Sequence, residues 1–265
     1  MNRRCGDRQL TFDDVGTGAG GAPVVLLHPF PFDRRYWAAT VAALAPRHRV
    51  ITLDARGFGE SPATGPFAIA DLASDLAALL DALGVPEAAV LGLSMGGYAA
   101  LAFAHLHPAR LAALVLADTR AAADSPETRR AREDARTLIE SSGSSTYLDR
   151  SLPRLLAPDA PPAVLARVRA LAEARGERII AGLAALRDRP DRTGELAAIR
   201  CPTLVIAGAR DQVIPLEEMR GMSAAIPGAR FVALDGIGHL ANLEAPAAFE
   251  AALRAFVDEL PAGAR

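Results

Sequence analysis

The residues best suited to chemistry form a short glycine-flanked turn around a serine. The pentapeptide GLSMG at residues 92–96 follows an apolar, strand-like run over residues 88–91 and leads into a helix-forming stretch. A nucleophile on so sharp a strand-to-helix turn needs strained backbone geometry, which small residues two positions away on either side permit. The turn lifts the Ser94 hydroxyl clear of the sheet and sets it at a helix N-terminus, where main-chain N–H groups favour developing negative charge. The pattern predicts Ser94 as a nucleophile.

A serine hydroxyl needs a base to take its proton, so the motif requires a histidine. His239 follows a predicted strand over residues 231–234 within the glycine-containing loop DGIGH. Because the carboxyl ends of parallel strands share one edge of a sheet, we expect His239 on the same edge as Ser94. The other histidines precede a strand, end the helix that begins at the serine, or lie in an earlier loop at this edge: His48, His105, His107 and His28.

The base in turn needs an acid that fixes its tautomer and stabilises the imidazolium. Asp211 stands directly after the predicted strand over residues 203–207, and the chain order is then serine, acid, histidine. Asp118 is the alternative, since it ends the strand before a long insertion and lies at the same edge. Asp235 is too close to His239 along the loop to be a comfortable partner. We favour Asp211.

Short apolar runs alternate with longer amphipathic stretches and so predict the elements that position these residues. Strands are expected over residues 24–27, 50–53, 88–93, 111–117, 203–207 and 231–234, and helices over 36–44, 69–83, 95–105, 216–225 and 246–259. Continuously apolar strands that alternate with helices indicate an α/β fold, with a mainly parallel twisted sheet covered by helices on both faces. Residues 9–15 are expected to form an antiparallel edge strand.

Residues 120–200 break this alternation. They contain no strong strand run, are rich in Ala, Arg, Leu and Glu, and are punctuated by prolines. We therefore predict a helical insertion between two strands, with residues 1–119 and 201–265 forming one α/β core.

The amino-acid composition argues against two classes of binding partner. The chain has 265 residues, 51% hydrophobic, 23% charged, and a net charge of −2. This balance argues against a nucleic-acid or anionic-membrane partner, which favour a concentrated basic face. No secretory signal or apolar run of about 18 residues appears. Cys5 and Cys201 lack metal-ligand spacing and suit unpaired thiols in a reducing cytoplasm. The sequence is compatible with either a monomer or a homodimer.

Several motifs together resemble those of the α/β-hydrolase superfamily. LHPFP at residues 27–31 is similar to the family's H-G-x-P loop, and DARGFGES at residues 54–61 to the D-x-R-G-x-G-x-S turn of its smaller esterase-like members. The segments 208–211 and 238–239 match the acid and base loops. The resemblance covers nearly the whole chain, and it implies that the insertion is a helical cap.

The resemblance also implies an oxyanion hole made by the main-chain N–H groups of Met95 and Phe30. Pro29 stands where glycine is usual and has no N–H, but the donor lies one residue later. Pro31 biases Phe30 toward extended geometry, and a cis Phe30–Pro31 bond is a further hypothesis. His28 is expected to stabilise its loop, and structural roles are expected for Arg56 and Ser61.

The expected reaction is acyl transfer through an acyl-enzyme on Ser94, without metal or organic cofactor, on a small, largely apolar ester or lactone. The resemblance is to small carboxylesterases and enol-lactonases. Cofactor-free haloperoxidases or perhydrolases and carbon–carbon bond hydrolases are alternatives with the same triad, and a ligand receptor without turnover is an alternative of another class.

Candidate lining residues in the cap are apolar or aromatic: Tyr147, Leu148, Leu152, Leu155 and Leu156. Packing between the cap and the core also accounts for these apolar positions, and we favour that explanation. Three arginines, Arg120, Arg150 and Arg154, could steer a carboxylate substrate, but we favour their interpretation as solvated cap residues.

Overall fold

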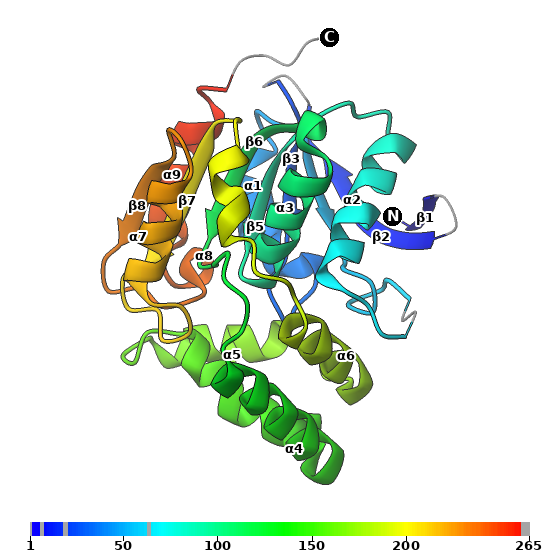
Figure 1. The fold of residues 1–265 in the computed structure, drawn as a ribbon, viewed down its shortest axis with the longest axis vertical. Coiled ribbons are helices and arrows are strands. Elements are labelled where there is room, and N and C mark those ends of the chain that lie inside the picture. Colours follow the sequence, from blue (N-terminus) through cyan, green and yellow to red (C-terminus); the bar gives the residue numbers. More distant parts are fainter. Residues whose placement is uncertain (1, 6–7, 18–20, 63–64, 261–265) are drawn as a thin grey trace.

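The computed structural model describes residues 2–5, 8–17, 21–62 and 65–260, and these form a twisted sheet with helices on both sides (Figure 1). The strand order is β1-β2-β4-β3-β5-β6-β7-β8. The bounds are β1 Asn2–Cys5, β2 Arg8–Val15, β3 Val24–Leu27, β4 Val50–Leu53, β5 Ala88–Leu93, β6 Leu111–Ala117, β7 Thr203–Gly208 and β8 Arg230–Leu234. All neighbouring pairs from β4 to β8 are parallel, so the predicted fold class is confirmed.

The predicted edge strand is antiparallel, but it is not at the edge. β2 pairs antiparallel with β4 on one side, and β1 pairs antiparallel with β2 on the other. The prediction of an edge position is therefore wrong. The run NRRC in β1 carries no apolar alternation, which is the pattern that indicates a half-buried strand in a sequence.

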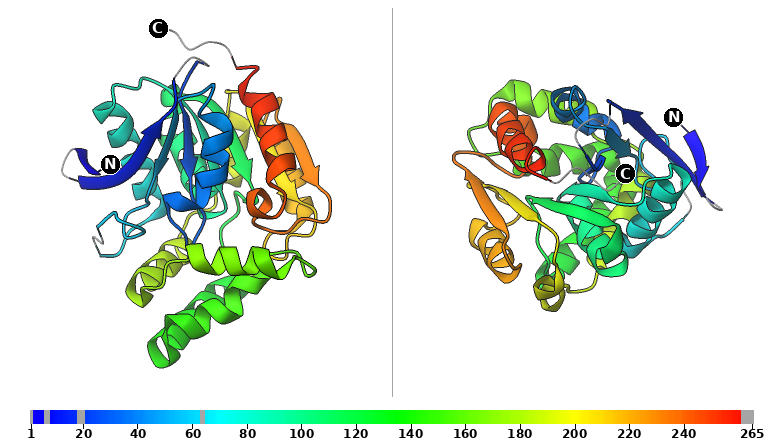
Figure 2. Two further views of the ribbon diagram at one scale, coloured as in Figure 1. Left: turned by 180° about the vertical axis from the view of Figure 1, so that it is seen from behind. Right: turned by 90° about the horizontal axis from the view of Figure 1, so that it is seen from above.

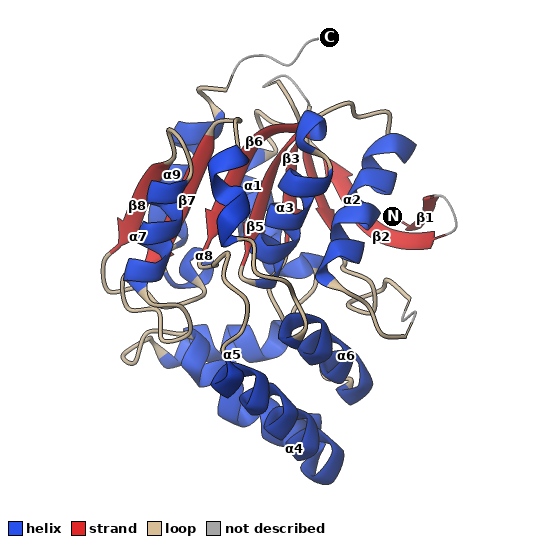
Figure 3. Ribbon diagram, in the orientation of Figure 1, coloured by secondary structure: helices blue, strands red, loops and turns tan. Residues whose placement is uncertain are grey.

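Two layers of helices enclose the sheet. Figure 2 shows them from behind and from above, and Figure 3 shows helices and strands in separate colours. Helices α2 Ile69–Ala82, α3 Met95–Leu106 and α7 Leu216–Ala225 contribute to one apolar cluster, and α1 Ala38–Leu44 and α9 Pro246–Val257 to the other. Residues of β3 alternate between them: Val25 and Leu27 face the first cluster, Val24 and Leu26 the second. Burial on both faces explains the uninterrupted apolar strands.

Between β6 and β7 the chain forms helices α4 Pro126–Ser151, η3 Leu152–Leu155, α5 Pro162–Leu171 and α6 Gly176–Arg187. Gly143 interrupts α4 with a φ of +83°. These elements, which we call the cap helices, lie beyond the carboxyl ends of the central strands (Figure 1). The last element of the insertion, η4 Thr193–Ala198, packs instead against α7, with Leu196 in the core cluster. The remaining short elements are η1 Arg34–Trp37, η2 Pro108–Arg110 and α8 Ala241–Glu244.

None of the helices in the described ranges is long and apolar enough to cross a membrane. Cys201 is a free, half-buried thiol, whereas the side chain of Cys5 lies outside the described residues.

Candidate active site

Ser94 occupies the strained turn that the sequence predicts. It lies between β5 and α3 with φ +52° and ψ −114°, which is rare for a residue with a side chain. Neighbouring groups hold the turn in place: the Ser94 N–H donates to the Ala117 carbonyl at 3.0 Å, and the Thr119 hydroxyl donates to the Ser94 carbonyl at 2.9 Å. The surrounding structure over-determines this geometry, as a strained functional turn requires.

The two flanking glycines are needed for close backbone approach. A Cβ at Gly92 would lie 2.1 Å from the Gly96 carbonyl oxygen, and a Cβ at Gly96 would lie 2.0 Å from the Leu27 carbonyl oxygen. Both distances are far inside van der Waals contact. The G-x-S-x-G spacing therefore reflects the packing of β5, α3 and the end of β3 against one another.

A chain of hydrogen bonds runs through the three residues that the sequence singled out. Nε2 of His239 lies 2.9 Å from Oγ of Ser94, and Nδ1 of His239 lies 2.7 Å from Oδ2 of Asp211. The other carboxylate oxygen of Asp211 accepts from the N–H groups of Val213 at 2.7 Å and Ile214 at 3.0 Å. The side chains of His239 and Asp211 are almost completely buried, so water does not compete for these bonds.

The electrostatics around His239 favour its protonated form. Burial lowers the pKa of the imidazole, but the negative charge of Asp211 and the hydrogen bond to it raise it more, and the net result lies above the ordinary 6.5. Arg120 opposes the rise. His239 is therefore suited to accept the Ser94 proton, because the fixed carboxylate of Asp211 stabilises the imidazolium that results.

Asp118, the alternative acid, has a different role in the structure. Its buried carboxylate accepts from the N–H of Gly208 at 2.8 Å and of Ala241 at 3.3 Å. Burial, followed by repulsion from Asp211, raises the pKa of this carboxyl well above its usual range. Asp118 thus ties the end of β7 to the segment just after His239 and makes no hydrogen bond with the imidazole.

The loop after β3 lies at the cavity that contains Ser94. The Phe30–Pro31 peptide bond is cis, as hypothesised, and the Phe30 ring lines the same cavity as Ser94. Met95 is the first residue of α3, so its N–H has no partner inside the helix. These are the two amides that the resemblance implies for an oxyanion hole.

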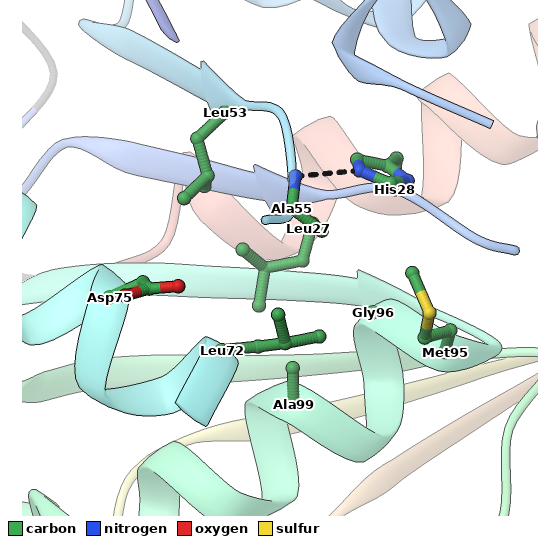
Figure 4. Close-up of a pocket in the computed structure, with 9 residues that line it drawn as sticks. All are labelled: Leu27, His28, Leu53, Ala55, Leu72, Asp75, Met95, Gly96 and Ala99. Carbon is green, nitrogen blue, oxygen red and sulfur yellow. Dashed lines mark hydrogen bonds between the residues drawn. The ribbon is translucent and has the colours of Figure 1, made fainter. Parts of the chain in front are cut away.

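His28 holds this loop to the next one. Its Nε2 accepts from the Ala55 N–H at 2.9 Å, so the proton resides on Nδ1, which donates to the Pro29 carbonyl at 2.9 Å. Burial lowers the pKa of His28, and the hydrogen bond that Nε2 accepts requires the neutral imidazole. Figure 4 shows the bond to Ala55 beside a cavity of about 20 Å³, with Met95 and Gly96 at the start of α3 nearby. Both ring nitrogens serve the backbone, as expected of a structural histidine.

The turn at residues 54–61 is a compact network built around Asp54. Its carboxylate accepts from the N–H groups of Arg34 and Glu60, each at 2.8 Å, and forms a 2.6 Å ion pair with the Arg34 guanidinium. The Ser61 hydroxyl donates to the Asp54 carbonyl at 2.9 Å. Arg56 pairs with buried Asp75 at 2.7 Å. Arg56 and Ser61 are therefore structural, as the sequence predicts.

A cavity of about 900 Å³ opens above Ser94 and His239, between the sheet edge and the cap helices. Of the predicted lining residues, Tyr147 and Leu155 line it. Leu148, Leu152 and Leu156 do not, and are buried in the second apolar cluster instead. Tyr147 and Ser151 are one turn apart on α4 and both line the cavity, whereas Leu148 lies on another side of that helix and Leu152 begins η3. Their prediction as pocket residues is corrected accordingly.

Sequence reasoning missed several residues of the cavity wall. Tyr98 lies one turn after Ser94 on α3, and that i, i+4 spacing could have identified it. Leu183 and Leu186 reach the cavity from α6, and Gln212 and Val213 from the loop after Asp211. The latter four depend on how the cap sits over the core, for which the sequence has no local signal.

Polar bonds fasten the insertion to the loops that carry Asp211, His239 and Phe30. The Gln212 side-chain amide donates to the Leu156 carbonyl at 2.7 Å, and Glu244 accepts from the N–H groups of Ala157 at 2.9 Å and Gly238 at 3.1 Å. The Glu173 N–H donates to the Pro31 carbonyl at 2.8 Å. These contacts join the cap to the acid loop, the base loop and the loop after β3.

Within the part of the chain that the structure describes, no cluster of three or more His, Cys, Asp or Glu residues could hold a metal ion.

The sequence of residues 24–252 matches the family model described as the alpha/beta hydrolase family. The chain belongs to the α/β-hydrolase family. This match spans β3 to α9 and includes the serine turn, both later loops and the cap helices.

Solved structures and a curated relative support the assignment. A thermophilic esterase from Thermogutta terrifontis, described as malate bound, is 38% identical with a TM-score of 0.89, covering 96% of this chain and 94% of that one. The enol-lactonase from Burkholderia xenovorans LB400 is 32% identical with a TM-score of 0.89, covering 98% and 100%. A Pseudomonas savastanoi pv. phaseolicola protein named carbamate hydrolase RutD is 32% identical over 84% of this chain and 89% of its own length.

Proposed function

We propose that this α/β-hydrolase is a serine hydrolase that cleaves a carboxylic ester or lactone of a small substrate through an acyl-enzyme on Ser94. The observation that carries the proposal is the Asp211–His239–Ser94 hydrogen-bond chain, which ends at a cavity large enough for a small ligand. In this proposal residues 120–200 act as the cap that shapes the substrate site. The substrate is a small molecule, and the cytoplasm is its expected compartment.

The first half-reaction forms the acyl-enzyme. Oγ of Ser94 bonds to the substrate carbonyl carbon while its proton passes to Nε2 of His239, and the carbonyl oxygen becomes an oxyanion. The main-chain N–H groups of Met95 and Phe30 stabilise that charge; donors of this kind are worth about 3–4 kcal/mol each. The tetrahedral intermediate then breaks the bond to the leaving oxygen, which takes the proton from His239 and departs as an alcohol.

The second half-reaction repeats these steps with water. His239 removes a proton from the water, the water oxygen bonds to the acyl carbon, and the bond to Oγ breaks as His239 returns the proton to Ser94. Asp211 keeps the imidazole in the tautomer that presents Nε2 to Ser94 and stabilises its charged form throughout. In a lactone the leaving oxygen stays attached to the acyl part, and the product is one hydroxy acid.

Similarity to an esterase and an enol-lactonase supports oxygen esters as the substrate class. The test is a kcat/KM panel of 4-nitrophenyl esters of increasing acyl length, simple lactones, and an N-alkyl carbamate ester, because a relative is named for carbamate hydrolysis. We expect turnover of esters or lactones that disappears in Ser94→Ala. Turnover that survives in folded Ser94→Ala would contradict the mechanism, and turnover confined to the carbamate would contradict the substrate class.

A further inference from the structure

One arginine of the cavity wall lies beside the nucleophile. Arg120 lines the cavity that contains Ser94 and His239, and its side chain is 17% exposed. It follows Thr119, whose hydroxyl donates to the Ser94 carbonyl at 2.9 Å. Its positive charge is near enough to His239 to lower the pKa of that imidazole. The guanidinium is therefore part of the reaction end of the cavity, on the core side.

The hydrogen bonding of Arg120 is incomplete. Its Nε is buried and has no partner among the described groups. Its Nη1 lies 3.3 Å from Oε2 of Glu218, which is on α7 and outside the cavity, and the Tyr98 hydroxyl also interacts with the guanidinium. A guanidinium has five N–H donors, and these two contacts do not occupy all of them. Arg120 therefore keeps donors for a further acceptor.

The other arginines of the cavity are in different situations. Arg132 is bound to the buried carboxylate of Asp124. Arg150 and Arg154 are exposed on the cap side, where water weakens electrostatic attraction. The two acidic residues of the lining, Glu127 and Asp134, are also exposed on α4. Arg120 thus combines an open donor, low exposure and closeness to Ser94.

We propose that Arg120 binds a carboxylate carried by the substrate, and that the enzyme acts on esters or lactones with such an anionic group. This inference rests on the proposed function. A carboxylate could accept from the two Nη groups together, in the bidentate geometry that guanidinium groups favour. Tyr98, Phe30, Leu183 and Leu186 line the same cavity, and apolar surroundings of this kind strengthen an ion pair.

Two substrates that differ only in charge test the proposal. The mono-4-nitrophenyl ester of glutaric acid carries a free carboxylate, and its methyl ester is the neutral match; rates without enzyme are subtracted from both. The measured quantity is the ratio of kcat/KM for the anionic to the neutral ester. We expect Arg120→Gln to lower this ratio roughly 10- to 100-fold, the usual worth of a hydrogen bond to a charged group. Arg120→Lys, which keeps the charge but loses the planar fork, should retain part of it.

Arg150→Gln and Arg154→Gln are the matched comparison variants, because they remove the same charge from the exposed side of the same cavity. We expect their ratios to stay within about twofold of the unaltered enzyme. Glutarate should also inhibit hydrolysis of the neutral ester competitively, and more weakly in Arg120→Gln. Thermal melting of each variant reports whether it is folded.

An unchanged ratio in folded Arg120→Gln and Arg120→Lys would overturn this inference, and so would an equal fall in Arg150→Gln or Arg154→Gln. Either result leaves the proposed function standing if the neutral ester is turned over in a Ser94-dependent way. Failure of the proposed function looks different, since neither ester would then show Ser94-dependent turnover.

Discussion

The two walls of the cavity are built in different ways. On the core wall, Ser94, His239 and Asp211 each have defined hydrogen-bond partners, and the loops that carry them are held by further main-chain bonds. On the cap wall, the α4 residues that line the cavity are mostly half-buried or exposed, and Arg150 is among the exposed ones. In the proposed function the core wall carries the reacting groups and, through Arg120, the site for the substrate carboxylate, whereas the cap helices shape the rest of the cavity.

Asp118 and Glu173 show how the two walls are held. Asp118 directly follows β6. Its buried side chain accepts from the N–H groups of Gly208 at the end of β7 and Ala241 at the start of α8. Glu173 pairs with Arg175 and Arg178 within the cap, while its own N–H donates to Pro31 in the loop after β3. The loops at the sheet edge are thus held by hydrogen bonds within the core, whereas the cap is attached to them through a few hydrogen bonds.

The largest effect should come from exchanging the acid on the core wall. In Asp211→Asn the side-chain amide can donate to Nδ1 of His239, which turns the imidazole into the tautomer that cannot accept from Ser94. We expect kcat to fall by roughly 10⁴-fold, the scale of the equivalent change in a serine protease. Steady-state kinetics on a 4-nitrophenyl ester measure it.

Asp118→Asn is the matched comparison, since it alters a neighbouring carboxyl at the same sheet edge and asparagine tolerates the φ of +43° found there. It should cost stability, about 1–3 kcal/mol for a main-chain N–H left without its acceptor, and far less kcat than Asp211→Asn. A loss of kcat in Asp118→Asn as large as in Asp211→Asn would make Asp118 an equal partner of His239.

The pH dependence of kcat/KM should reflect the protonation of His239 on the core wall. His239 acts as a base only when neutral, and its pKa is raised above the ordinary 6.5. Activity should therefore rise with pH through a midpoint above 6.5, falling tenfold per pH unit well below it. His28, whose pKa is lowered, should add no limb in this range. A midpoint below 6.5 would contradict the stabilisation of the imidazolium by Asp211.

A smaller effect should follow from pushing the cap away from the core. A Cβ at Gly182 on α6 would lie 2.7 Å from the Phe30 ring and 2.9 Å from the Phe58 ring. Gly182→Ala should cost roughly 1–3 kcal/mol of unfolding free energy through overpacking, and lower kcat/KM because it shifts Phe30. Denaturant titration and kinetics on one ester measure both.

Gly221→Ala is the control, because this helical glycine has nothing within 4 Å of the added methyl group. It should stabilise the protein by about 0.5–1 kcal/mol through helix propensity. If Gly182→Ala behaved in the same way, the cap would not press on the loop that carries Phe30.

The core wall could be predicted from the sequence because its signals are local. The strand, the serine turn and the order of acid and base each depend on a few neighbouring residues, and main-chain geometry then brings Ser94 and His239 together. The rotation of a cap helix is instead set by tertiary packing, so the sequence could not tell that Tyr147 faces the cavity while Leu148 does not. The sequence around Arg120 does not distinguish it from a solvated arginine, since its burial depends on packing against α3 and α7.

The central claim is that Ser94 is the nucleophile activated by His239, and covalent labelling tests it most directly. A fluorophosphonate forms a stable bond to an activated serine hydroxyl, and peptide mass spectrometry locates it. We predict one label per chain on Ser94, none in Ser94→Ala, and strongly slowed labelling in His239→Ala. Labelling of another residue at the same rate, or none of the folded unaltered protein, would contradict the account.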